Sequence, residues 1–504
     1  MNETSSHWFE SLFERGNALA NLQRNADAIP CYLDVLDFAP THVRAQNNLG
    51  VMFAELKRFP EAIMHYQQAI SIQPDYADAH YNLANAFKEN HKTTNALDHY
   101  RLAIQYQPNF ASAYNNQAIC LMQTGEMHRA IESFEAALRL SPHMATAHNG
   151  LGLALAHIGR PNDAMICYDR ALQLDSDLAE AHYNRGLCSL LLGDLLAGWR
   201  DYEWRWRLPE IIPRQFAEPM WDGGPLEGKT ILVHAEQGLG DTIQFVRFAR
   251  LLEQRGARVL LQCSNKLHGL LRNCRGVHEL LPERPVSFPP FDVHCPIMSL
   301  AKYFVGNLQS IPKEVPYLLA KESRIERWKR ELSSHSGMKI GLCWQGSKGY
   351  RWDHLRSIAL QEMKPISQIA NVQLISLQKG LGSEQVAANN FLVHDFTDGM
   401  DNEQDALLDT AAMISCLDLV ISVDSAIGHL AGTLGAPTWL ALSKGPDWRW
   451  HLGGDRSPWY PKTRLFRQTD FGDWPSVFQR MATELREVLL KSNKAAFENN
   501  MNQE

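Results

Sequence analysis

A spacing of 34 residues dominates the first 200 positions of this 504-residue chain. One proline and one alanine return at that interval: Pro40, Pro74, Pro108 and Pro142, with Ala28, Ala62, Ala96, Ala130 and Ala164. A fixed period of this length arises when a pair of helices is repeated and each pair buries its apolar face against the next. The sequence therefore predicts an all-α superhelix over residues 1–207, with about five and a half repeats.

Two more positions keep the period. Small residues recur at Gly16, Gly50 and Gly152, and large rings recur at Tyr32, Tyr66, Tyr100, Phe134 and Tyr168. The pattern resembles the tetratricopeptide repeat from residue 8 to about residue 207, and the resemblance implies a groove that receives a protein partner. After the last repeat we expect Trp199, Trp204 and Trp206 to cover the open end of the array.

An asparagine recurs at one position of the first helix in most repeats: Asn48, Asn82, Asn116 and Asn184. The arrangement is similar to that of O-GlcNAc transferases, in which such asparagines hold the backbone of an extended peptide. An equally good alternative is that each side chain bonds a neighbouring repeat. The sequence leaves both readings open.

The character of the chain changes after the repeats. Residues 208–228 are rich in proline and glycine and form a linker or a wrapped arm. Two stretches, 229–320 and 337–490, then alternate short apolar runs with helical ones, which is typical of parallel sheets covered on both faces. We expect strands at 231–235, 258–263, 291–297, 338–344, 371–377, 391–396, 417–423 and 436–442, helices at 241–256 and 321–336, and a polar tail at 491–504.

Charge and composition narrow the functional classes. The net charge of -7 argues against a nucleic-acid partner, which requires a basic surface. No apolar stretch approaches the ~20 residues of a transmembrane helix, and the N-terminus lacks the features of a secretory signal. The nine cysteines are scattered without paired motifs, as in proteins of a reducing compartment. We expect a cytoplasmic protein.

A glycine-rich turn follows the first apolar run of the second half, with Gln237, Gly238, Gly240 and Asp241 in sequence. The turn lacks the third glycine of a dinucleotide fingerprint, and its carboxylate would repel phosphate. Asp241 is either a helix N-cap or a base that takes a proton from a hydroxyl. A second match, to the phosphate-binding P-loop at 223–230, is rejected because a strand and not a helix follows it.

A later turn suits an anion. Ser425 and His429 open a helix after a buried strand, so free backbone N–H groups, a hydroxyl and an imidazole converge there. Another loop, at 344–357, carries Trp344, Gly346, Lys348, Arg351 and Arg356. The simpler interpretations are a buried structural histidine and solvated loop charges.

Together these turns resemble the heptosyltransferase-type sugar transferases of glycosyltransferase family 9, although Ala426 stands where that family has glycine. The resemblance implies a GT-B fold, with two Rossmann-like domains facing a cleft. It assigns the base to Asp241, the acceptor-side loop to Gln237, Gly238 and Gly240, and the nucleotide-diphosphate sugar to a set of donor-side residues: Trp344, Gly346, Lys348, Arg356, Ser425 and His429. No cofactor or metal is expected, because the single D-x-D, at 175–177, lies in a repeat turn.

The resulting hypothesis is a metal-independent glycosyltransferase whose repeats recruit a protein acceptor. Two alternatives remain. The chain is a catalytically silent scaffold that binds nucleotide sugar or protein partners, or it glycosylates lipopolysaccharide or another glycan.

Overall fold

The computed structural model describes residues 3–401 and 406–501, with side chains from 8–401 and 406–491. The chain forms two compact units. The first comprises residues 1–155 and 166–178, and the second comprises residues 156–165 and 179–504.

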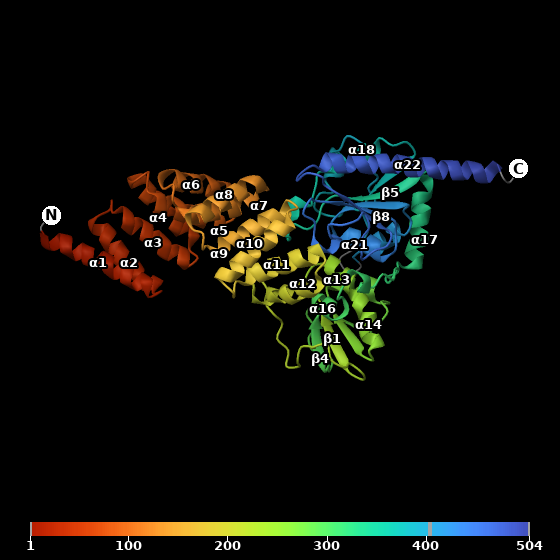
Figure 1. Cartoon of the computed structure of the whole chain (residues 1–504), viewed down its shortest axis with the longest axis horizontal. Helices are drawn as coiled ribbons and strands as arrows, with labels where there is room; N and C mark the ends of the chain where they lie inside the picture. Colours follow the sequence, from red (N-terminus) through yellow and green to blue (C-terminus); the bar gives the residue numbers. More distant parts are fainter. Residues whose placement is uncertain (1–2, 402–405, 502–504) are drawn as a thin grey trace. The chain divides into compact units, whose positions relative to one another are not determined.

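The first unit is a series of helical hairpins (Figure 1), as the 34-residue period predicts. Its core depends on alternating small and large residues. Ala62 is fully buried, and a Cβ on Gly50 would lie 2.6 Å from the Tyr66 ring, so only glycine admits that ring between the helices. The helices are α1 (Glu3–Asn21), α2 (Asn25–Phe38), α3 (Val43–Glu55), α4 (Phe59–Ile72), α5 (Ala77–Glu89), α6 (Thr93–Tyr106), α7 (Ala111–Gln123) and α8 (Met127–Leu140), with most of α9 (Ala145–His157) and of α10 (Pro161–Leu174).

The second unit begins with one more hairpin, α11 (Ala179–Leu192) and α12 (Leu195–Tyr202), followed by a 3₁₀ turn η1 (Glu203–Arg207). Trp199 on α12 is buried and packs edge-on against Trp448, with ring centroids 5.1 Å apart. Trp204 instead stacks on His182 at 3.7 Å. The last repeat is therefore packed into the α/β part of the chain.

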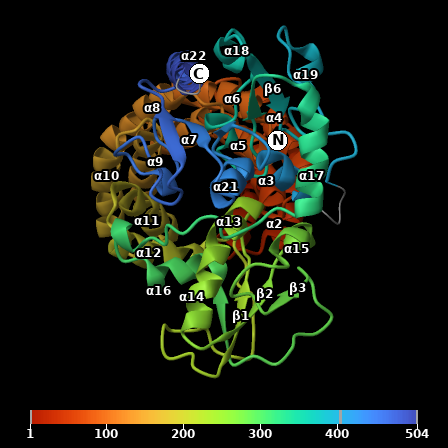
Figure 2. The ribbon, with the colours of Figure 1, turned by 90° about the vertical axis from the view of Figure 1, so that its right-hand side faces the viewer.

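The first sheet is fully parallel, with strand order β3-β2-β1-β4. Figure 2 shows β1, β2 and β3 side by side. The strands are β1 (Thr230–His234), β2 (Arg258–Gln262), β3 (Glu279–Leu281) and β4 (Val293–Pro296), and the helices are α13 (Leu239–Phe245), η2 (Val246–Phe248), α14 (Ala249–Gln254), η3 (Asn265–Leu267), α15 (His268–Leu271), η4 (Ile297–Ser299), α16 (Leu300–Phe304) and η5 (Leu308–Ser310).

The second sheet is also fully parallel, with order β6-β5-β7-β8-β9. Helix α22 packs Phe478 and Met481 into the core on one face of this sheet and runs beside α18 (Figure 1). The strands are β5 (Met338–Cys343), β6 (Val372–Ser376), β7 (Leu419–Val423), β8 (Thr438–Leu442) and β9 (Thr463–Arg467). The helices are α17 (Glu322–Glu331), η6 (Leu332–Ser334), η7 (Asp353–Leu355), η8 (Leu360–Met363), α18 (Lys364–Ser367), α19 (Gln385–Ala388), α20 (Leu408–Ile414), α21 (Ala426–Thr433), η9 (Trp448–Trp450) and α22 (Trp474–Met501).

Several local expectations differ from the structure. Strands β3 and β9 were not expected, and the run 391–396 forms only one bridge, between Ile375 and His394. The helix expected at 241–256 divides into α13, η2 and α14. Residues 208–228 wrap onto the first sheet, where the backbone N–H of Trp221 donates to the carbonyl of His294. Short runs lack enough periodicity to be distinguished from loops, which explains these misses.

Membrane-spanning segments were sought among the described helices. None of these helices is both long enough and apolar enough to cross a bilayer.

Candidate functional site

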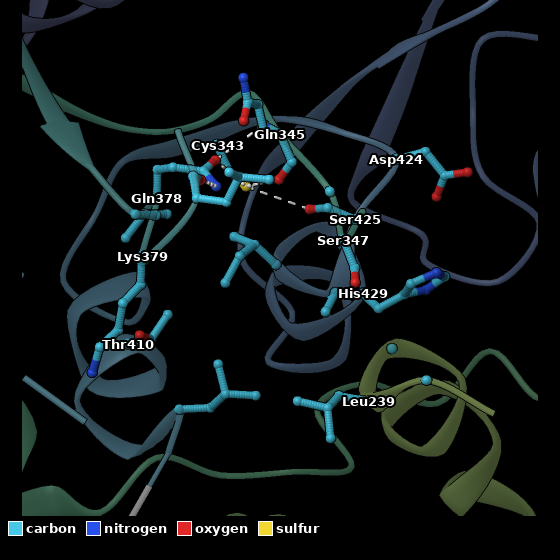
Figure 3. Close-up of a pocket in the computed structure, with 18 of the residues that line it drawn as sticks. Leu239, Cys343, Gln345, Ser347, Gln378, Lys379, Thr410, Asp424, Ser425 and His429 are labelled. Carbon is cyan, nitrogen blue, oxygen red and sulfur yellow. Dashed lines mark hydrogen bonds between the residues drawn. The ribbon is translucent and has the colours of Figure 1, made fainter. Parts of the chain in front are cut away.

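A cavity of the second unit has a volume of about 930 Å³. It opens at the carboxyl ends of β1, β5 and β7, where parallel sheets usually bind ligands. Figure 3 shows Cys343, Gln345 and Gln378 on one wall, with Leu239 of the α13 turn and His429 of α21 on another. Most of the predicted site residues line this cavity: Gly238, Gly240, Asp241, Gly346, Lys348, Arg356, Ser425 and His429.

The first turns of α13 and α21 meet at this cavity. A Cβ on Gly240 would lie 3.1 Å from Cδ2 of His429 and 3.3 Å from Cα of Ala426. Glycine at 240 therefore permits the close approach, and the small side chain of Ala426 fits against it. The two helix N-termini, each with free N–H groups, consequently border one space.

Both carboxylate oxygens of Asp241 accept hydrogen bonds from the protein. Oδ2 accepts the backbone N–H of Gly238 at 2.9 Å. The N-cap of α13 is Gly238, so Asp241 is not the N-cap but the third helical residue, which bonds back to it. Oδ1 accepts Nη2 of Arg449 at 2.5 Å. Burial raises the pKa of this carboxyl, Arg449 opposes the shift, and Asp447 adds to it. The side chain retains 21% exposure, so it faces the cavity.

Arg449, which was not expected from the sequence, bonds three side chains of the site. Its side chain is 8% exposed and donates to Asp241, to Asp447 at 2.9 Å and to Gln244 at 2.7 Å. Burial lowers its pKa, but Asp447 and Asp241 outweigh burial and raise it. In the sequence its only signal is a basic residue between two tryptophans, Trp448 and Trp450.

Ser425 and His429 lie where predicted, at the start of α21. The hydroxyl of Ser425 is 2.9 Å from Oγ of Ser422 and 3.5 Å from the Cys343 sulfur. His429 stacks on Trp450 at 5.2 Å, and its Nδ1 is 3.0 Å from the hydroxyl of Tyr460. Burial, reinforced by Arg449, moves the pKa of His429 well below its usual value, so the imidazole is neutral at pH 7.

Asp424 precedes this turn and also lines the cavity. Burial and the nearby Asp447 raise the pKa of its carboxyl to about 6, although Arg356 and Arg449 act in the opposite direction. A carboxyl with this pKa is partly protonated just below neutral pH. It is therefore a weaker obstacle to an anion than an ordinary aspartate.

The basic loop contributes two different cations. Lys348 is exposed and borders the cavity. Arg356 is more enclosed, with Nε 3.1 Å from Oδ1 of Asp353 and its guanidinium 4.5 Å from the Tyr350 ring centroid. Gly346 lies so close to this pair that a Cβ would be 2.5 Å from Asp353. The cavity thus combines one exposed cation, Lys348, with one cation held by neighbouring side chains, Arg356.

Two predicted site residues lie elsewhere. Trp344 is fully buried in the core of the second sheet and does not border the cavity, so the expectation of donor contact through its side chain is wrong. It is an inward-facing residue that continues the strand. Gln237 borders a different cavity, where its amide donates to the hydroxyl of Tyr202 at 2.8 Å.

That second cavity measures about 330 Å³ and lies at the carboxyl ends of the first sheet's strands. Its wall includes Trp206, Arg214 and Glu236. Burial raises the pKa of Glu236 to about 7, even though Arg205 donates to it at 3.0 Å. Sequence reasoning missed Glu236, which is marked only by a charge directly after a buried strand.

The recurrent asparagines of the first unit are bonded within the array. Nδ2 of Asn48 donates to Asn17 at 3.0 Å, Nδ2 of Asn82 to Asn47 at 3.0 Å, and Nδ2 of Asn116 to Asn85 at 2.9 Å. These bonds join adjacent repeats and favour the alternative reading of the pattern. Asn184 lies on α11 in the second unit. A peptide-binding role for the four residues stays a prediction.

Potential metal ligands were also sought. The described part of the chain holds no group of three or more His, Cys, Asp or Glu side chains arranged to bind a metal ion.

Comparison with known protein families identifies the repeats. A model described as TPR repeat matches residues 50–91, and one described as Tetratricopeptide repeat matches residues 81–143 and 125–179. Residues 50–179 are tetratricopeptide repeats. Such repeats stack into extended concave surfaces that bind proteins.

The chain is also similar to curated and solved proteins. Protein FlbA of Caulobacter vibrioides is 27% identical over 321 residues, which cover 59% of this chain and 53% of that protein. The chain thus spans about half the length of this curated relative. Solved structures with similarity include MamA, with 23% identity, 34% and 94% coverage of the two chains and a TM-score of 0.31. Another is TTC0263, a TPR protein of Thermus thermophilus, with 18% identity, 36% and 99% coverage and a TM-score of 0.31.

Proposed function

We propose that the chain is a metal-independent glycosyltransferase of the GT-B type. It moves a sugar from a nucleotide-diphosphate donor to an acceptor hydroxyl. The observation that carries this proposal is the position of Asp241 at one helix N-terminus, directly against a second helix N-terminus that bears Ser425 and His429, on one cavity at the carboxyl ends of two parallel sheets.

The donor side of the cavity suits a diphosphate. The start of α21 supplies free N–H groups and a dipole that favours negative charge. Lys348 and Arg356 add positive charge, and the neutral His429 donates through Nε2 in the tautomer whose Nδ1 accepts from Tyr460. Together these groups stabilise the departing diphosphate, as preorganised donors do in other transferases.

Asp241 supplies the base. Its carboxylate takes the proton of the acceptor hydroxyl while that oxygen forms a bond to the anomeric carbon. The bond from this carbon to the donor phosphate breaks, and its electron pair leaves with the diphosphate. The 330 Å³ cavity at the first sheet lies on the same side as the α13 turn and shares Leu239 with the larger cavity, so it provides room for the acceptor.

The acceptor is a protein hydroxyl. Tetratricopeptide repeats bind protein segments, and a catalytic unit on the same chain gains a high effective concentration of whatever the repeats hold. The protein is expected to act in the cytoplasm, where nucleotide sugars are made.

A nucleotide-sugar panel tests the proposal. Wild-type protein is screened by thermal shift against UDP-, GDP-, ADP-, CMP- and dTDP-linked sugars, because a ligand that binds the folded state raises the melting temperature. The stabilising donor is then incubated with wild type and with Asp241→Asn. Donor consumption by wild type with at least about a hundredfold loss in the variant supports the proposal. No stabilisation by any nucleotide sugar refutes it.

A scaffold without turnover is the second candidate. It is favoured by the hydrogen bonds that both carboxylate oxygens of Asp241 already accept from within the protein. Donor binding without consumption by wild type, even with a lysate supplying acceptors, would establish this alternative. Glycopeptides that are found in cells with the gene and are missing from cells without it would count against the scaffold. They would also count against a glycan acceptor.

A further inference from the structure

Arg449 connects the two halves of the proposed site. Through Nη2 it binds Asp241 on the acceptor side, and through Nη1 it binds Asp447, which lies just before η9 on the donor side. Gln244, one turn after Asp241 on α13, fixes Nε. The guanidinium also lies over the Trp448 ring, 4.4 Å from its centroid, so its orientation is set by four neighbours.

This arginine has capacity for a further anion. Each terminal nitrogen carries two N–H groups, and among the described residues only one N–H of each is used, by Asp447 and by Asp241. Arg449 borders the same cavity as Lys348 and the α21 turn. Its charge already reaches that turn, because it contributes to the low pKa of His429. Bidentate guanidinium groups are well suited to phosphate oxygens.

Resting on the glycosyltransferase function proposed above, we infer that Arg449 is shared between Asp241 and the donor diphosphate. In the structure its charge balances the Asp241 carboxylate. As Asp241 takes the acceptor proton it becomes neutral, and the charge of Arg449 becomes available to the diphosphate, which gains negative charge at the same moment. One buried cation thus serves both the base and the leaving group.

The arrangement has a consequence that does not depend on turnover. Asp241 and a bound diphosphate compete for the same positive charge, so neutralising Asp241 should strengthen diphosphate binding. This increase in diphosphate affinity should require Arg449. Calorimetry at pH 8, well above the pKa of about 6 that Asp424 has in the wild-type chain, measures it with UDP, GDP, ADP and inorganic pyrophosphate as ligands.

The expected pattern is a thermodynamic cycle. Asp241→Asn, which keeps an oxygen for Arg449, should bind the best diphosphate about three to ten times more tightly than wild type, because a carboxylate no longer competes with the diphosphate for the charge of Arg449. Arg449→Met should bind it at least about tenfold more weakly. Asp241→Asn added to Arg449→Met should then have no further effect.

Controls separate this inference from the proposed function. Glu279→Gln removes the carboxylate of an exposed ion pair with Arg258 outside the cavity and should leave affinity unchanged. If Arg449→Met fails to fold, Arg449→Lys replaces it, because lysine keeps the positive charge but lacks the two terminal nitrogens of the guanidinium. In this background Asp241→Asn should increase diphosphate affinity by less than it does in wild type. Tightening that persists in the Arg449 variants, or no tightening at all, overturns the inference while diphosphate binding still stands. Wild type that binds neither these four ligands nor dTDP overturns both.

Discussion

Trp199 donates its indole N–H to the backbone carbonyl of Val305 at 3.2 Å, although the two residues are 106 positions apart. The same indole packs against Trp448, which adjoins Arg449. A helix that the sequence assigns to the tetratricopeptide repeats is thus part of the core that supports the candidate site. Any shortened form of the catalytic part must retain α11 and α12.

Replacing Trp199 should therefore damage the second unit. Trp199→Ala should lower the free energy of unfolding by about 3–5 kcal/mol, because it leaves a large cavity and an unpaired carbonyl at Val305. Urea denaturation followed by fluorescence measures this loss. Leu196→Ala on the same helix is the control, since Leu196 is 69% exposed and should cost under about 0.5 kcal/mol. An equally small loss of unfolding free energy in the two variants would show that α12 does not contribute to the core of the second unit.

Gly240 controls the approach of the two helix N-termini. Gly240→Ala places a methyl group 3.1 Å from His429, which should push α13 and α21 apart and lower stability by about 1–3 kcal/mol. Nucleotide-sugar affinity should fall as well. Gly453→Ala provides a matched control, because nothing lies within 4 Å of the added Cβ. Thermal melts and calorimetry report the two effects, and an unchanged affinity would exclude this contact from the site.

The two cations of the basic loop should behave differently. Lys348→Ala should weaken diphosphate binding about three- to tenfold without changing the melting temperature, because the side chain is exposed. Arg356→Ala should weaken binding and also lower the melting temperature, since it leaves Asp353 without its ion pair. Calorimetry and thermal melts on the same samples distinguish them. A Lys348 variant with wild-type affinity would remove that residue from the donor site.

The raised pKa of Asp424 predicts that the stability of the folded chain depends on pH. Its pKa is about 6 in the folded chain, against an ordinary value of 3.8, so the folded state binds the extra proton between those values. The contribution of the Asp424 carboxyl to the free energy of unfolding is therefore fully present only below about pH 4. This contribution is lost as the pH rises through 6. Asp424→Asn should raise the melting temperature at pH 8, with a gain of about 1–3 kcal/mol, and by less at pH 5. The exposed Asp455→Asn should show no such trend, and a destabilised Asp424→Asn protein at pH 8 would contradict the assignment.

The inter-repeat asparagines should contribute stability. Asn116→Ala removes bonds to Asn85 and to the Tyr81 hydroxyl, and should cost about 1 kcal/mol or more. Asn109→Ala, at an exposed turn position, should cost little. Urea denaturation of the full chain, followed by circular dichroism, gives both values. A variant at Asn116 that is fully stable yet loses a bound peptide would instead support the peptide-ladder reading.

Local sequence patterns were enough to predict much of the fold. The 34-residue period specified the helical hairpins, because a repeated apolar face can be buried only against its own copy. Apolar runs such as 231–235 and 417–423 gave the central strands β1 and β7, because strands buried on both faces must be apolar throughout. The short strand β3 and the edge strand β9 have no such signature, since they gain their hydrogen bonds from neighbours distant in the sequence.

The sequence by itself determined the helical array, the two parallel sheets and the turns that bear Asp241, Ser425 and His429. Only the tertiary structure decided which of these residues share a cavity, that Trp344 is core, and that Arg449 binds Asp241. The reason is physical. Periodicity and turn chemistry act between residues close in the chain, whereas Asp241 and Arg449 are 208 positions apart and meet only because two separately formed sheets present their carboxyl ends to the same space.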